Sequence, residues 1–164
     1  ELGYPNQEVR ESMLRHLILA FTGGHQGSAA TPALRMARAI HSDHVDEFCE
    51  NLNSLLAAPP YELHQNDEPY YHSIAYLALA LIGVHIQTEI HTSKGRIDAV
   101  IETETSTYVI EFKTNQTATI ALHQIENKGY LTPYLQNGKS LYALAINFNT
   151  KEKKVDDWIV ESIH

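Results

Sequence analysis

The sequence of 164 residues has little cysteine, no long apolar run and few basic residues. A single cysteine, Cys49, excludes an internal disulfide or a metal cluster built on cysteines, and it fits a reducing, cytoplasmic setting. No apolar run reaches the roughly 18 residues that a membrane span needs, because Gly83 and His85 interrupt the longest one. The start lacks a methionine and the basic and apolar stretches of a signal peptide. We therefore expect a globular domain without a membrane span, taken from a longer chain.

The small number of basic residues disfavours non-specific binding to nucleic acid. Lys and Arg number 12 against 20 Asp and Glu, so the formal net charge at pH 7 is -8 with the ten histidines neutral. Non-specific binding of nucleic acid depends mainly on Lys and Arg side chains that neutralise phosphates. The composition therefore disfavours such a binder unless basic residues gather locally. The candidates for a local basic stripe are Lys94, Arg96, Lys113, Lys128 and Lys139.

Proline and glycine divide the chain into two parts with different patterns. Residues 1–60 carry apolar residues at helical spacing only. This spacing predicts a helix after Asn6, one that starts at Thr31 and one that is capped by Ser42. The sequence AAPP then ends the last helix. We therefore expect an all-helical segment over 1–60 and a second unit over 61–164.

The second unit shows the order helix, three strands, helix, two strands. A helix is predicted for EPYYHSIAYLALALIG, and alternation in VHIQTEIH predicts a strand with Val84, Ile86 and Ile90 on one face. Two more strands are predicted for RIDAVIE and TYVIEFK. The next helix is predicted for TATIALHQIENKGYLTPYLQ, with a kink or early break at Pro133 and an end at Gly138. The last two strands are predicted for SLYALAINF and VDDWIVESI.

Charged residues stand on the two strands around the turn at Glu104 and Thr105. If the strands pair symmetrically about that turn, Asp98 lies opposite Glu111, and Lys113 shares the face of Glu111. Two like charges opposed across a sheet are destabilising, and burying them unpaired is costly. A divalent cation held between the carboxylates would remove this cost. A solvated sheet edge, with Lys113 as an ordinary ion-pair partner, explains the same spacing, and both alternatives stay open at this point.

The order of these charged residues along the chain forms a longer motif. The motif begins after the predicted helix that carries Glu68. It consists of Asp98, a spacer of twelve residues and the triplet EFK, which begins at Glu111. This pattern resembles the PD-(D/E)XK nuclease superfamily, with Ile97 in place of the motif's proline. The resemblance implies a restriction-endonuclease-like core with the element order αβββαβ. This core is of the α/β class, with a mixed sheet of the α+β type. An all-helical N-terminal segment would precede it.

A narrower resemblance covers nearly the whole chain. The segments that carry it are YPNQEVRESML, EPYYHSIAYLALALIG, GRIDAVIET, YVIEFK, ALHQIENKGY and LYALAINF. They are similar to the C-terminal part of a bacterial family in which a predicted AAA-type ATPase precedes a PD-(D/E)XK nuclease domain. The resemblance implies that residues 1–60 link to an N-terminal ATPase domain that is missing from this chain, and that residues 61–164 form the nuclease-like domain.

The resemblance also implies a metal site. Asp98, Glu111 and the backbone carbonyl of Phe112 would hold Mg²⁺ or Mn²⁺. Glu68, in the first turn of its helix, would complete the acidic cluster directly or through water. The bound cation would polarise the phosphoryl oxygen during phosphodiester hydrolysis and generate hydroxide near neutral pH. Glu68 has a second explanation, because the helix dipole favours an acid in the first turn whether or not it binds metal.

Two further polar residues receive roles from the same resemblance. Lys113 would orient or activate the attacking water and stabilise the charge that develops on the phosphate. Gln124, on the helix after the core strands, would steady the lysine or the substrate, although a solvated helix residue is an equal alternative. We expect Tyr130 to be a core residue, and His72 to be a packed histidine rather than a partner of the acids.

Two hypotheses for function remain. The first is metal-dependent phosphodiester hydrolysis of nucleic acid, DNA rather than RNA. The second is a catalytically silent, nuclease-fold module that binds to or regulates an AAA-type ATPase. The acidic balance favours the second hypothesis. The intact set of Asp98, Glu111 and Lys113 favours the first, because a degenerate domain is expected to have lost at least one of them.

Overall fold

The computed structural model describes residues 30–57, 68–81 and 85–163. Its elements are α2 (Ala30–His41), α3 (Val45–Leu56), α4 (Glu68–Leu81), β1 (His85–Thr92), β2 (Gly95–Glu102), β3 (Ser106–Thr114), α5 (Ala118–Asn127), the 3₁₀ helix η2 (Thr132–Tyr134), β4 (Ser140–Asn149) and β5 (Lys154–Ile163). From α4 onward, this is the predicted order of elements. The helix predicted after Asn6 lies outside the described residues. No helix in the described ranges combines the length and the apolar character needed to cross a membrane.

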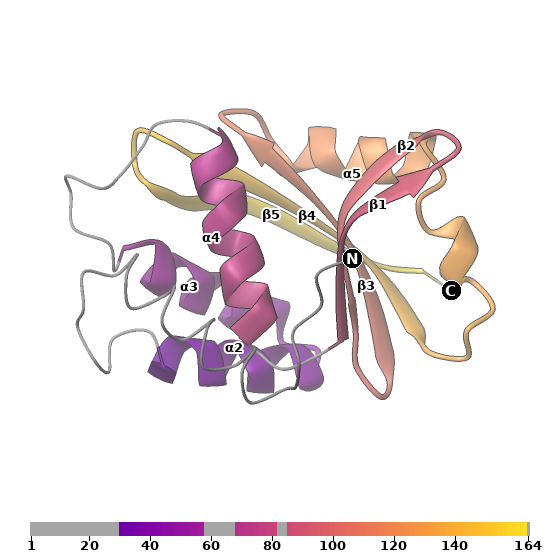
Figure 1. Cartoon of the computed structure of the whole chain (residues 1–164), viewed down its shortest axis with the longest axis horizontal. Helices are drawn as coiled ribbons and strands as arrows, with labels where there is room; N and C mark the ends of the chain where they lie inside the picture. The colour runs from indigo at the N-terminus through magenta and orange to yellow at the C-terminus, as the bar shows by residue number, and fades with distance from the viewer. Residues whose placement is uncertain (1–29, 58–67, 82–84, 164) are drawn as a thin grey trace, which may run out of the picture.

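The five strands form one mixed sheet in the order β1-β2-β3-β4-β5 (Figure 1). Strands β1, β2 and β3 form an antiparallel meander, β4 runs parallel to β3, and β5 returns antiparallel to β4. Parallel neighbours need a crossover, and α5 provides it between β3 and β4. This mixed sheet with flanking helices confirms the predicted α+β, restriction-endonuclease-like fold class.

Helices cover both faces of the sheet. Helices α2, α3 and α4 lie on one face, which we call the α4 face, and α5 lies on the other, the α5 face (Figure 1). Alternate residues of a strand point to opposite faces. On β3, the α4 face therefore receives Tyr108, Ile110 and Phe112, while the α5 face receives Val109. Each face thus has an apolar core, and the strands between them are buried on both sides.

The described part of the N-terminal segment shares the core of the sheet. Phe48 and Leu52 of α3 belong to the same hydrophobic cluster as Tyr108 and Phe148 of the strands. The Asn53 side chain adds two hydrogen bonds to the backbone of β5. It donates to the Val155 carbonyl at 2.9 Å and accepts from the Val155 N–H at 2.6 Å. Helices α2 and α3 are therefore packed onto the sheet, while the division of the chain at residue 60 stays a prediction.

The predicted cap of α3 is wrong. The N-cap is His44, which makes no side-chain capping bond, whereas Ser42 belongs to the turn that closes α2. The Ser42 N–H donates to the Arg38 carbonyl at 3.1 Å, and the His44 N–H donates to the Ala39 carbonyl at 2.9 Å. Asp43 between them has a φ of 57°. A left-handed residue after the last turn of a helix is a common way to satisfy its last carbonyls, and Asp tolerates this conformation.

The helix predicted to continue to Gly138 already ends at Asn127. Gly129 has a φ of 62°, and the Tyr130 N–H donates to the Ile125 carbonyl at 3.0 Å. These bonds reverse the chain at the helix end, and glycine accepts the left-handed conformation without a Cβ penalty. Pro133 lies in the separate helix η2. The early break brings Tyr130 back under the sheet, where it is buried.

The predicted shared face of Ile86 and Ile90 on β1 is also wrong. Ile86 packs against the cluster on the α4 face, and Ile90 packs against the cluster on the α5 face. Glu89 between them has a φ of 53°, which interrupts the regular alternation of an extended strand. The end of the β1–β2 hairpin is therefore turned relative to the rest of the sheet.

Candidate active site

Strands β2 and β3 separate at the position of the two acids. Their backbone pairing runs from Glu102 with Thr107 to Ala99 with Ile110. One step further, the same register would oppose Asp98 and Glu111, as the symmetric turn predicts. Here the ladder stops, and the Phe112 N–H donates to the Asp98 carboxylate at 2.9 Å instead. Beyond this point β2 continues to pair with β1, and β3 continues to pair with β4.

A pocket of about 380 Å³ lies where the two strands diverge. Its walls come from β2, β3, α4 and the end of α5. The residues that line it are His72, Gly95, Arg96, Asp98, Glu111, Phe112, Lys113, Gln124, Lys128 and Tyr130. Asp98 and Glu111 share the α5 face with their strand neighbours Val100 and Val109. Of the two alternatives that the spacing left open, the solvated sheet edge does not fit, because Asp98 is only 7% exposed and Glu111 only 2%.

The two oxygens of the Glu111 carboxylate have different surroundings. Oε1 accepts a hydrogen bond from the Lys113 ammonium at 2.9 Å and another from the Gln124 side-chain amide. Oε2 is buried and has no hydrogen-bond partner among the described residues. A buried acceptor without a partner loses the hydration that it had in the unfolded chain, which is unfavourable. One oxygen is therefore held in place by two donors, and the other has no hydrogen bond within the described part of the chain.

Both acids have pKa values above their ordinary range. The pKa of Glu111 is raised from 4.5 to about 7, mainly by burial and then by the charge of Asp98, against the opposing effects of Lys113 and Arg96. Burial also raises the pKa of Asp98, although the hydrogen bond from the Phe112 N–H lowers it in part. Two neighbouring carboxylates in a dry site do not ionise independently, because each charge disfavours the other. A cation between them would favour the ionised form of both.

The donors in the pocket fit a hard divalent cation. Carboxylate and backbone carbonyl oxygens are the ligands that Mg²⁺ and Mn²⁺ prefer, and Asp98, Glu111 and Phe112 can supply them. Within the described residues, no three His, Cys, Asp or Glu side chains gather closely enough to hold a metal ion by themselves. Water and a substrate phosphate would have to complete the coordination, as is usual for Mg²⁺. The unpaired Oε2 of Glu111 is the feature of this pocket that such an ion would satisfy.

The structure brings four of the five side chains predicted for the site together. Asp98, Glu111, Lys113 and Gln124 line one pocket, and the backbone of Phe112 lies between the two acids and the lysine. Gln124 contacts Glu111 rather than Lys113. Glu68 is the first residue of α4. Its side chain lies outside the described part of the chain, so its role stays a prediction.

Aromatic residues and a histidine complete the pocket wall. Tyr130 is buried in the core, as predicted, and its ring also borders the pocket. His72 packs against the ring of Phe112 with the centroids 5.3 Å apart, and it lines the pocket as well. His72 therefore lies on the side of α4 that faces the pocket.

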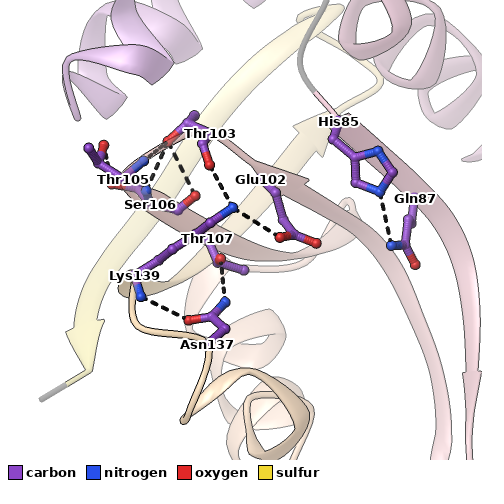
Figure 2. A network of polar contacts seen from close by, with 9 residues as sticks. All are labelled: His85, Gln87, Glu102, Thr103, Thr105, Ser106, Thr107, Asn137 and Lys139. Atoms are coloured by element: carbon purple, nitrogen blue, oxygen red, sulfur yellow. Dashed lines mark hydrogen bonds and ion pairs between the residues drawn. The ribbon is translucent and has the colours of Figure 1, made fainter.

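The predicted basic stripe is correct for four residues and wrong for Lys139. Figure 2 shows that Lys139 lies at the opposite end of β2 and β3, where its ammonium contacts Glu102 at 3.2 Å and the Thr103 carbonyl at 2.7 Å. Because β4 runs parallel to β3, its first residues lie beside the first residues of β3. The site lies beside the last residues of β3. Lys139 therefore stabilises the β2–β3 turn and does not reach the pocket.

Comparison with known proteins identifies the family. The chain is 27% identical over 169 residues to a protein of Azotobacter chroococcum mcd 1 named "Uncharacterized protein in vnfD 5'region". The alignment covers 99% of this chain and 33% of that protein, so the chain spans about a third of the relative's length. No solved structure gives a significant match. Residues 66–158 match the family model described as PD-(D/E)XK nuclease superfamily. This match covers more than half of the chain, which therefore belongs to the PD-(D/E)XK nuclease superfamily.

Proposed function

We propose that the protein is a metal-dependent nuclease that hydrolyses phosphodiester bonds of nucleic acid, with DNA as the substrate. The observation that carries this proposal is the convergence of Asp98, Glu111 and Lys113 in one pocket, where Glu111 presents a buried oxygen without a partner. The ion pair with Lys113 uses only the other oxygen of Glu111, so it does not offset the unfavourable burial of this one. The arrangement instead provides two acids for a cation and an amine beside them.

The proposed metal ligands are Asp98, Glu111 and the carbonyl of Phe112, with Glu68 as a further ligand directly or through water. Nucleases of this superfamily generally use divalent metals, and we propose Mg²⁺ or Mn²⁺ for this chain. Such an ion supplies a Lewis acid for the phosphoryl oxygen and an activated water near neutral pH. The Asp98 carboxylate is held by the Phe112 N–H, so its direction is set before any ligand arrives.

Lys113 and Gln124 are the proposed partners of the reacting groups. The Lys113 side chain is 16% exposed and borders the pocket while it donates to Glu111. An ammonium in this position can hold the attacking water and stabilise the negative charge that grows on the phosphate. Gln124 donates to the same Glu111 oxygen, so it keeps that carboxylate oriented when Lys113 turns toward substrate.

A second candidate is a catalytically silent nuclease-fold module of an AAA-type ATPase. The net charge of -8 favours it, and the chain spans only about a third of its relative's length. In both candidates we propose that residues 61–164 act as the nuclease-like domain of a larger, ATPase-linked protein. Residues 1–60 would form the segment that leads to the ATPase domain.

The test compares cleavage of plasmid DNA, single-stranded DNA and RNA with Mg²⁺, Mn²⁺ or chelator, using the wild type, Asp98→Ala and Lys113→Ala. Lys139→Ala is the matched control, because it removes an ion-paired lysine at the far end of the same strands. The proposal predicts that cleavage requires the metal and falls by at least about a hundredfold in both site variants. The control should cleave at the wild-type rate.

Binding of Mn²⁺, measured by calorimetry, separates the two candidates. Cleavage by all four proteins at equal rates would refute the assigned site. If Mn²⁺ binds to the wild type but not to Asp98→Ala, and no substrate is cleaved, the silent module is the better description. If Mn²⁺ does not bind and nothing is cleaved, both the metal site and the nuclease activity are refuted.

A further inference from the structure

Two basic side chains border the pocket, and a third lies close to them. Arg96 of β2 and Lys128 at the C-cap of α5 both line it. Lys94 lies in the β1–β2 turn, and its Nζ is 3.8 Å from the position that a Cβ on Gly129 would occupy. Gly129 directly follows Lys128, so the β1–β2 turn and the end of α5 meet at this place. We call Lys94, Arg96 and Lys128 the basic rim.

The charges of the basic rim are largely uncompensated. Among the described residues, neither Lys94 nor Lys128 forms an ion pair, and both are exposed. Arg96 pairs with Glu89 at 3.3 Å, but both side chains are about half exposed, and such a pair contributes little to stability. The mutual repulsion of the three cations of the basic rim would be relieved by an anion that reaches all three.

Two glycines keep the rim open. Gly95 has a φ of 154° and Gly129 a φ of 62°, both values that disfavour residues with a Cβ. A Cβ on Gly95 would lie 2.6 Å from the Tyr130 hydroxyl. The chain therefore approaches Tyr130 with bare backbone at the pocket wall. Lys94 and Arg96 directly flank Gly95 in the sequence, and Lys128 directly precedes Gly129.

The pocket and the rim carry opposite charges, which restricts the ligand. Asp98 and Glu111 repel a free anion, so an isolated phosphate gains little from the pocket without a cation. A polymer with regularly spaced phosphates can place one at the acids while its neighbours lie on the rim. We propose that Lys94, Arg96 and Lys128 bind the backbone phosphates next to the scissile one. The nucleic acid would then leave the pocket across the β1–β2 turn and the C-terminal end of α5. This inference rests on the proposed nuclease function.

The closing experiment uses two double variants with the same net charge. Lys94→Ala/Lys128→Ala removes two charges from the rim, and Arg35→Ala/Arg38→Ala removes two exposed charges from α2, which lies away from the β1–β2 turn (Figure 1). Cleavage of a DNA oligonucleotide is measured at several salt concentrations, and binding of the same oligonucleotide is measured in chelator. The rim variant should raise KM about tenfold with kcat within about twofold.

The salt dependence gives a second readout. The slope of log KM against log salt should decrease by about 2 in the rim variant, because each lost phosphate contact removes about 0.9 for duplex DNA. The α2 variant should keep the wild-type KM and slope. Equal effects of the two double variants would overturn the phosphate contacts while leaving the nuclease function intact. Binding that depends on the rim without any cleavage would support the rim and refute hydrolysis. No binding and no cleavage by the wild type would refute both.

Discussion

Replacing Glu111 by glutamine should make the metal-free protein more stable at pH 8, although it removes a proposed metal ligand. The pKa of Glu111 rises from 4.5 to about 7 on folding, mainly through burial and then through the charge of Asp98. Between pH 4.5 and 7 the unfolded chain is ionised at this position while the folded chain holds the proton. The folded state therefore loses stability as the pH rises through this range, and above pH 7 the loss is constant.

The magnitude follows from the same values. One pKa unit corresponds to about 1.4 kcal/mol, so the rise from 4.5 to about 7 sets an upper limit of about 3 kcal/mol for the cost of ionising Glu111 in the fold. Glutamine keeps the shape and can accept from Lys113 and Gln124, but it carries no charge. Glu111→Gln should thus match the wild type near pH 4.5 and exceed its stability by up to about 3 kcal/mol at pH 8.

The assay is urea unfolding at pH 5 and pH 8 in chelator, followed by the same measurement with Mg²⁺. Glu126→Gln is the matched control, since it makes the same chemical change at an exposed position of α5. Saturating Mg²⁺ should stabilise the wild type and the control but not Glu111→Gln, because a ligand stabilises only the state that binds it. A stability difference that is the same at both pH values, or equal stabilisation of all three proteins by Mg²⁺, would refute this account of Glu111.

Two further predictions concern the surroundings of the site. Asn53→Ala should lower the free energy of unfolding by about 1–3 kcal/mol in urea titration, because it leaves the buried Val155 N–H without an acceptor; an unchanged value would argue against the docking of α3 on β5. Gly95→Ala should destabilise by about 1–3 kcal/mol, since its Cβ would lie 2.6 Å from the Tyr130 hydroxyl. Adding Tyr130→Phe should restore part of that loss in the same assay, and no restoration would show that the backbone conformation alone is responsible.

The relation between the two acids was predictable from the sequence because it depends on local rules. A tight turn at Glu104 and Thr105 sets the register of β2 and β3, and alternation sets the faces. These rules place Asp98 opposite Glu111 and put Lys113 on the same side as Glu111. They do not reveal that the pairing of β2 with β3 stops at this point. Beyond it, β2 pairs only with β1 and β3 only with β4, and the local rules do not describe these pairings.

Other features depend on tertiary contacts or on competing local signals. The Ser42 side chain is suited to an N-cap, but the Ser42 N–H donates to the carbonyls of Arg38 and Ala39. Ser42 therefore belongs to the turn that closes α2. Gly129 could have been recognised as a helix end, since glycine after a lysine C-cap is a common signal, but Pro133 is the more conspicuous helix breaker. The prediction that Lys139 lies near the site was wrong because its position depends on the parallel pairing of β3 with β4. The spacing of residues along the sequence does not show this pairing.

The acidic composition and a nucleic-acid substrate are compatible because the charges are segregated. Asp98 and Glu111 are buried at the point where two strands separate, so their repulsion acts on the pocket rather than on the approaching strand. Of the cations that a phosphate chain would meet, Arg96 and Lys128 are exposed residues of the pocket wall, and Lys94 lies in the adjoining β1–β2 turn. The unfavourable burial of the two acids raises the free energy of the metal-free site, so a cation bound between them would relieve this cost. Under the proposed metal site, the lower stability of the wild type at pH 8 in chelator and its stabilisation by Mg²⁺ would both measure the burial of the Glu111 charge.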